Sequence, residues 1–175
     1  MVLVVRERKR AKAAPGRDNL TQRQKKRPVE THNRVEIVNR QRCRPMDAAR
    51  WREFAERALG QIGKSGASAT IAFVSDRAMR RLNRDFRGRD AATDVLSFPH
   101  EPDKFEQAAE NDLGDVVISV ERAAAQAAGN GLDFELEVAQ LILHGLLHLC
   151  GYDHETDDGA MDRLELKLRR RLGIY

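Results

Sequence analysis

The chain has 175 residues, of which 41% are hydrophobic and 5% aromatic, enough for one domain with a core of aliphatic side chains. Its longest apolar stretch is interrupted by His144 and His148 and is too short to cross a bilayer, so we expect no membrane segment. The net charge of +4 is uneven, because residues 1–44 carry 14 Lys and Arg against four Asp and Glu and the remainder is acidic.

The first 32 residues show neither helical nor strand periodicity and are rich in basic and amide side chains. We therefore expect residues 1–32 to be a disordered basic extension and residues 33–175 to form the folded domain. A basic arm over residues 1–44 favours contact with nucleic acid, because neutralising phosphates releases counterions. A solvated extension without a function has the same composition, and both interpretations stay open.

The pattern of apolar and turn residues after residue 33 predicts alternating strands and helices. Asp47, Ser75 and Asp133 are expected N-caps, and Phe86 is expected on the apolar face of its helix. Such an order indicates a layered α/β or α+β domain. The expected elements are strands at 35–38, 67–74, 94–99 and 114–120, and helices from 47 to 60 or 63, 76–87, 121–128, 134–150 and from 157 or 158 onward.

Three of the five histidines lie within eleven residues, in the segment HGLLHLCGYDH. His144 and His148 are four residues apart, so both side chains leave the same face of a helix. Gly151 permits the left-handed turn that brings His154 back toward them. Three neutral imidazoles leave a fourth tetrahedral position open, which is typical of a catalytic Zn²⁺ site, and we expect one Zn²⁺ per chain. Cys150 would leave the other side of the helix and is ranked below His154 as a ligand.

The spacing HxxxHxxGxxH is that of metzincin peptidases, with one difference. Those enzymes carry glutamate directly after the first histidine as the general base, whereas this chain has Gly145. Loss of a general base typically lowers the rate by about 10²–10⁴. The sequence therefore disfavours a peptidase without excluding it.

Three segments together resemble the YbeY family of bacterial rRNA-maturation endoribonucleases. They are HGLLHLCGYDH, LNRDFRGRDAATDVLSFP (residues 82–99) and LGDVVIS (residues 113–119), in the family's order. The resemblance extends over about residues 33–175. It implies an α+β domain with a mixed four-stranded sheet packed with about five helices. It also implies Zn²⁺-dependent cleavage of single-stranded RNA in 16S rRNA maturation and ribosome quality control, with the small ribosomal subunit as a partner.

Carried onto this chain, the resemblance makes His144, His148 and His154 the Zn²⁺ ligands and assigns catalytic roles to Arg87 and His144. An arginine suits this chemistry, because a guanidinium can bind two oxygens of a phosphodiester. Arg77, Arg81 and Arg84 precede Arg87 on one helix face, and this face is either solvated or in contact with RNA.

Three further residues are candidates for the site. Arg84 and Ser97 are expected RNA contacts, although packing is an equal possibility for Ser97. Asp153 is a candidate partner for the second ring nitrogen of a ligand histidine, or a turn residue. The alternatives to a ribonuclease are a zinc peptidase and a ribosome-assembly factor with a structural Zn²⁺. Two free cysteines, Cys43 and Cys150, fit a cytoplasmic protein.

Overall fold

The computed structural model describes residues 32–100, 111–154 and 157–175, so the expected disordered extension lies almost wholly outside the described residues. Within them the predicted α+β class is confirmed, with a mixed four-stranded sheet and five helices. In chain order the elements are β1 (Arg34–Asn39), α1 (Ala48–Ile62), β2 (Ser68–Val74), α2 (Asp76–Arg87), β3 (Val95–Pro99), β4 (Asp112–Ser119), α3 (Val120–Asn130), α4 (Phe134–Leu149) and α5 (Ala160–Leu172).

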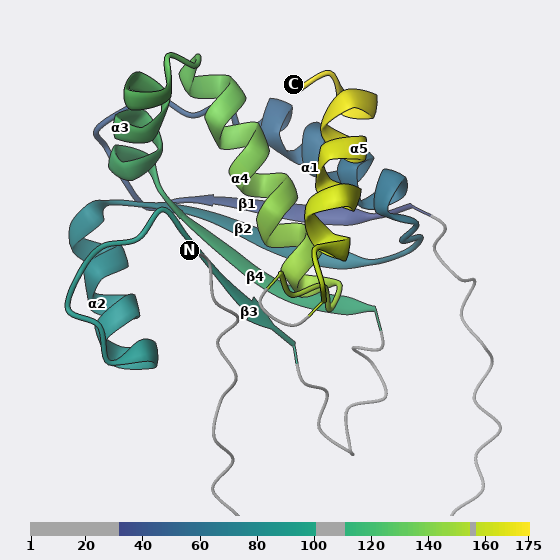
Figure 1. Cartoon of the computed structure of the whole chain (residues 1–175). Helices are drawn as coiled ribbons and strands as arrows, with labels where there is room; N and C mark the ends of the chain where they lie inside the picture. Colours follow the sequence, from purple (N-terminus) through teal and green to yellow (C-terminus); the bar gives the residue numbers. More distant parts are fainter. Residues whose placement is uncertain (1–31, 101–110, 155–156) are drawn as a thin grey trace, which may run out of the picture.

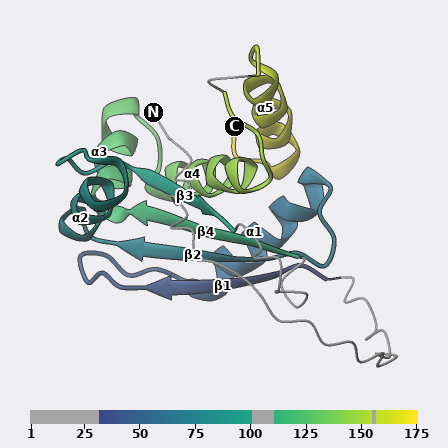
Figure 2. The same cartoon turned by 90° about the horizontal axis from the view of Figure 1, so that it is seen from below.

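The sheet has the strand order β1-β2-β4-β3 (Figures 1 and 2). β1, β2 and β4 are parallel, and β3 runs antiparallel to β4 at one edge. The register places Ser97 of β3 opposite Val116 of β4. α4 packs across β3 and β4 at this edge of the sheet.

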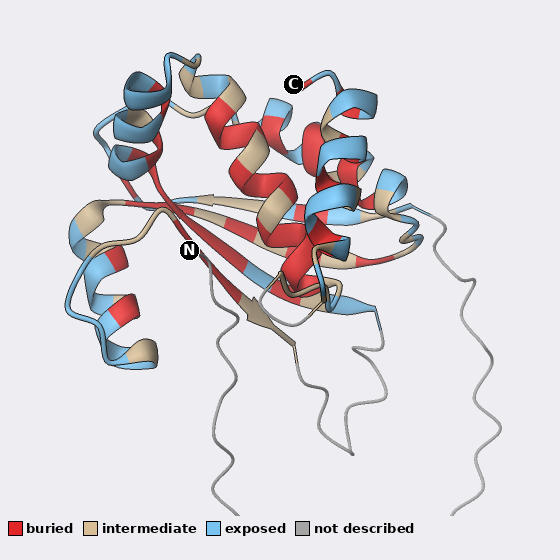
Figure 3. Cartoon of the chain, in the orientation of Figure 1, coloured by how far each residue is buried: buried red, intermediate tan, exposed pale blue. Residues whose placement is uncertain are grey.

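The two faces of the sheet are covered unequally. Strand alternation sends Val116 and Ile118 of β4 to the larger core, which α1, α3, α4 and α5 cover, and sends Val117 to a smaller core under α2 (Figure 1). α4 is buried along most of its length (Figure 3). A helix that is apolar on nearly every side is expected at the centre of a domain, and α4 occupies that place.

Most predicted helix ends are confirmed. The Asp47 side chain accepts from the backbone N–H of Ala49 and Arg50, and Gly63 closes α1 with φ +96°. Ser75 caps α2 in the same way, through Ala78 N–H. Asp133 occupies the predicted cap position of α4, but its side chain makes no capping hydrogen bond.

Several sequence predictions differ from the structure. α5 begins at Ala160, whereas a start at 157 or 158 was predicted, because Asp157 lies before the helix and its side chain accepts from the backbone N–H groups of residues 159–161. β4 begins at Asp112, two residues before the predicted start, because Asp112 pairs with Ser68 across the sheet. Phe86 was expected on a buried helix face but is 45% exposed. α2 extends past the sheet there, and the Phe86 ring meets the Phe98 ring edge-on with centroids 5.1 Å apart. No helix of the described residues is long and apolar enough to cross a membrane.

Candidate metal centre

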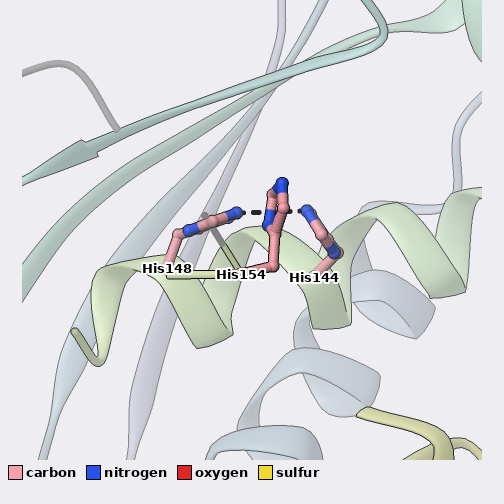
Figure 4. Close-up of side chains that lie close together, drawn as sticks. All are labelled: His144, His148 and His154. Atoms are coloured by element: carbon pink, nitrogen blue, oxygen red, sulfur yellow. Dashed lines mark hydrogen bonds between the residues drawn. The ribbon is translucent and has the colours of Figure 1, made fainter. Parts of the chain in front are cut away.

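The three histidines of the HxxxHxxGxxH segment converge, as the sequence predicted (Figure 4). His144 and His148 leave one face of α4, four residues apart, and their Nε2 atoms are 3.1 Å apart. One ligand nitrogen from each of the three residues lies within 4.8 Å of the others. Two ligands of a single tetrahedral Zn²⁺ with Zn–N bonds of about 2.05 Å stand roughly 3.3 Å apart, so the spacing suits one ion.

The turn after α4 is formed by hydrogen bonds that need a left-handed residue. Gly151 has φ +92°, its N–H donates to the His148 carbonyl at 3.0 Å, and the Tyr152 N–H donates to the Leu147 carbonyl at 3.1 Å. This pair of bonds is the Schellman arrangement of a helix C-terminus. It reverses the chain, so that His154 faces the two histidines of the helix (Figure 4).

The second ring nitrogen of each helical histidine is held by an acceptor. His144 Nδ1 lies 2.8 Å from Glu165 Oε2 of α5, and His148 Nδ1 lies 2.9 Å from the Tyr152 carbonyl oxygen. Because both partners only accept, both Nδ1 atoms carry the proton, and the Nε2 atoms of the neutral rings are bare. Two bare nitrogens 3.1 Å apart would both be satisfied by one bound cation.

His154 gives a further indication. Its Nδ1 is buried and has no hydrogen-bond partner among the described residues. Buried ring nitrogens are normally satisfied, and a metal ion satisfies such an atom as well as a hydrogen bond does. The donor set of three imidazoles, two of them held through Nδ1, therefore fits a metal ion of the Zn²⁺ type.

The surroundings keep the ligands ready to bind metal. Burial and the neighbouring His144 lower the pKa of His148 to about 4, so its ring is neutral at physiological pH. Burial opposes the charge of Glu165, but hydrogen bonds from His144 and Arg169 hold the pKa of Glu165 below its usual value. Arg169 Nε donates to Glu165 Oε1 at 3.0 Å. Glu165 is thus an ionised carboxylate that lies between the Arg169 guanidinium and the His144 imidazole.

Gly145, which stands where a peptidase would carry its glutamate, faces the sheet. A Cβ atom on Gly145 would lie 2.5 Å from a methyl group of Val116. The Ser97 hydroxyl, fully buried, donates to the Gly145 carbonyl at 3.3 Å. This residue therefore permits α4 to approach β4 closely, and any side chain there would point away from the histidines.

The other predicted site residues come from α2, from β3 and from the turn after α4. Arg87 is the last residue of α2, which covers the opposite face of the sheet from α4. Arg84, also on α2, pairs with Asp85 at 3.2 Å. The charge of Asp153 favours the protonated form of His148. The predicted roles of these residues and of Ser97 stay predictions.

Cys150 is not part of the histidine cluster. It occupies the C-cap of α4, and burial raises the pKa of its thiol to about 11. A protonated thiol is a poor metal ligand, which agrees with ranking Cys150 below His154.

Glu165 is the residue that sequence reasoning missed. It belongs to the buried face of α5 together with Met161, Leu168 and Leu172. A carboxylate on an otherwise apolar helix face needs a partner, and this need was the sign in the sequence that Glu165 has a specific role. The sequence could not say that the partner is a histidine on another helix.

Comparison with known proteins agrees with the motifs. A sequence model of the endoribonuclease YbeY family matches residues 36–173. The endoribonuclease YbeY of Solibacter usitatus is 46% identical over 121 residues, which are 69% of this chain and 76% of that protein. That of an Anaeromyxobacter species is 45% identical over 130 residues, 73% of this chain and 66% of that protein. The solution structure of TM1509 from Thermotoga maritima has a TM-score of 0.52 at 25% identity and covers 79% of this chain and 88% of that one.

Proposed function

This chain belongs to the endoribonuclease YbeY family, and on that premise we propose that it is a Zn²⁺-dependent endoribonuclease acting on single-stranded RNA. We propose further that it acts in 16S rRNA maturation and ribosome quality control in the cytoplasm. The convergence of three imidazoles, two of them fixed through Nδ1, is the observation that carries the proposal. The basic residues 1–44 would add affinity for rRNA and the small ribosomal subunit.

The ligand type favours zinc over magnesium, because imidazoles suit Zn²⁺ whereas Mg²⁺ prefers oxygen. Zn²⁺ at His144, His148 and His154 would supply Lewis-acid chemistry that polarises a phosphoryl oxygen and activates water. The protein's part is to hold the three rings in one tautomer and orientation. Glu165 does so for His144, and the Tyr152 carbonyl does so for His148. Asp153 would support His148 through its charge.

Arg87 and Arg84 would bind the phosphates of the RNA strand. The Phe86–Phe98 contact holds the C-terminal end of α2 beside the edge strand β3, and Ser97 of β3 is hydrogen-bonded to Gly145 of α4. A strand of RNA that crosses the β3 edge would therefore meet the arginines of α2 on one side and the histidines on the other. Ser97 is fully buried and would meet RNA only if β3 moved away from α4.

A zinc peptidase is the second candidate, and the ligand spacing favours it. Gly145 opposes it, since the position that would carry the base is packed against Val116. A ribosome-assembly factor with a structural zinc is the third candidate, and the basic residues 1–44 are the feature in its favour.

One experiment separates these candidates. The full chain, His144→Ala and Arg87→Ala are each incubated with single-stranded RNA, double-stranded RNA and casein, with Arg77→Ala as a control on the exposed side of α2. We expect the wild type and Arg77→Ala to cleave only single-stranded RNA and the other two variants to be inactive.

Cleavage by all four proteins would indicate a contaminating nuclease and contradict the proposal. Casein cleavage would favour the peptidase, and RNA binding without cleavage at full zinc content would favour the assembly factor. Circular dichroism of each variant shows whether a loss of activity reflects a loss of fold.

A further inference from the structure

A cleft of about 450 Å³ opens beside the histidines and has His144 and His154 in its wall. Its remaining wall comes from the loop before β3 and from α3, α4 and α5. Three carboxyl groups line it, those of Asp94, Glu137 and Asp162, against one guanidinium, that of Arg169. Arg169 is already hydrogen-bonded to Glu165. The cleft is therefore acidic, which is unexpected beside a site that would act on phosphate.

Glu137 differs from the other carboxylates of the cleft. It is only 7% exposed, yet no described residue donates a hydrogen bond to its side chain. Asp94, by contrast, accepts from the Gln126 amide at 3.1 Å, the Thr93 hydroxyl and the Val95 N–H, both at 2.9 Å. Burial and the charge of Asp94 raise the pKa of Glu137, against the opposing charge of Arg169. Neither carboxyl oxygen of Glu137 is among the fully buried atoms that lack a partner, so both oxygens reach the cleft and are available to a ligand that donates hydrogen bonds.

The position of Glu137 on α4 limits what it can do. It lies seven residues before His144, two turns away on the same helix face, or roughly 10.5 Å along the axis. A general acid or base must come within about 3 Å of the proton it moves, or reach it through one water. Glu137 is thus too far away to act at a phosphate held at the histidines. Its distance suits contact with a neighbouring nucleotide of a bound strand.

The chemistry of the cleft determines which part of that nucleotide it would bind. The carboxylates repel phosphate and accept hydrogen bonds from N–H groups. In single-stranded RNA the Watson–Crick edges of the bases are free to be recognised. Guanine presents two adjacent donors there, N1–H and the N2 amino group, which match the two oxygens of one carboxylate. The other bases place an acceptor next to their donor, and that acceptor would face a carboxylate oxygen.

We propose that this cleft is a nucleobase subsite, in which the Glu137 carboxylate accepts two hydrogen bonds from a guanine next to the scissile phosphate. The proposal rests on the proposed RNA-cleaving function. It makes Glu137 a residue that determines sequence preference and takes no part in the cleavage step.

The affinity for oligonucleotides tests the proposed nucleobase subsite without requiring that the RNA be cleaved. Fluorescence anisotropy measures the affinity of the full chain for a uridine dodecamer with one central guanosine and for the same dodecamer with inosine, which lacks the N2 amino group. A chelator keeps the RNA intact. The variant is Glu137→Gln, and the matched control is Glu135→Gln, an exposed carboxylate on the same helix.

We expect the wild type and Glu135→Gln to prefer guanosine over inosine by about tenfold, the discrimination typical of a bidentate base contact. Glu137→Gln should bind both oligonucleotides alike and keep its thermal stability. Equal affinity of the wild type for both, or a preference that survives in Glu137→Gln, would overturn the proposal. A guanosine preference that depends on Glu137, in a protein that does not cleave RNA, would overturn the proposed function and leave the subsite standing.

Discussion

The Glu165 carboxylate of α5 lies 2.8 Å from Nδ1 of His144 on α4, so a helix beyond the HxxxHxxGxxH segment orients the first histidine of that segment. Both side chains are largely buried, at 8% and 19% exposure. The carboxylate fixes the tautomer of His144 and the orientation of its ring.

Replacing Glu165 with Gln should therefore lower Zn²⁺ affinity by about 10–100-fold, because an amide holds the ring less strongly than a carboxylate does. Competition with a chromophoric chelator measures the affinity. Asp162→Asn is the control, since Asp162 lines the cleft beside His144 without a described bond to a histidine. An equal loss in Asp162→Asn would assign the effect to the overall charge of the cleft.

Replacing Gly145 with Ala should destabilise the protein by about 1–3 kcal/mol, because the new methyl group would overlap Val116. Urea unfolding measures the free energy, and in a double-mutant cycle Gly145→Ala and Val116→Ala should be less than additive. Gly60→Ala is the control. No atom lies within 4 Å of a Cβ there, and the change should stabilise α1 by about 0.5–1 kcal/mol. A neutral Gly145→Ala would show that α4 can move away from β4.

Replacing Gly151 with Ala should cost about 1–2 kcal/mol and weaken Zn²⁺ binding, because the left-handed φ of +92° strains a residue with a Cβ. Gly151→Asn should be milder, since asparagine adopts left-handed conformations more readily. Thermal unfolding and zinc titration test both variants. If both lost stability while zinc affinity stayed unchanged, the turn would not be what positions His154.

The metal-free protein should become less stable as the pH falls from about 6.5 toward 4. The pKa of His148 is lowered from 6.5 to about 4 in the folded state, so the unfolded chain binds the proton more readily. The stabilising contribution is complete above pH 6.5 and falls with the pH, and the total loss amounts to roughly 3 kcal/mol once the pH is below the folded pKa.

Urea unfolding of chelator-treated protein at several pH values measures this slope. His148→Gln removes the titrating group and should flatten the curve in that interval. If the variant keeps the full slope, the dependence belongs to other groups, such as the carboxylates.

The local features of this protein follow from short patterns in its amino-acid sequence. Hydrophobic periodicity and capping residues predict the elements, and the spacing of His144, His148 and Gly151 predicts the ligand cluster, because each depends on residues a few positions apart. The sequence did not predict the start of β4 at Asp112, because Asp112 pairs with Ser68, a residue far from it along the chain.

The groups that support the site, by contrast, are brought to it by the packing of distant segments. Glu165 reaches His144 because α5 packs on α4, and Gly145 is required because α4 lies directly on Val116. Packing likewise left Glu137 in the cleft wall without a described partner. Contacts between distant segments depend on how complete elements pack, and the residues' order along the chain does not encode that. The sequence therefore predicted the histidine cluster, and the packing of helices on the sheet determined what holds and surrounds it.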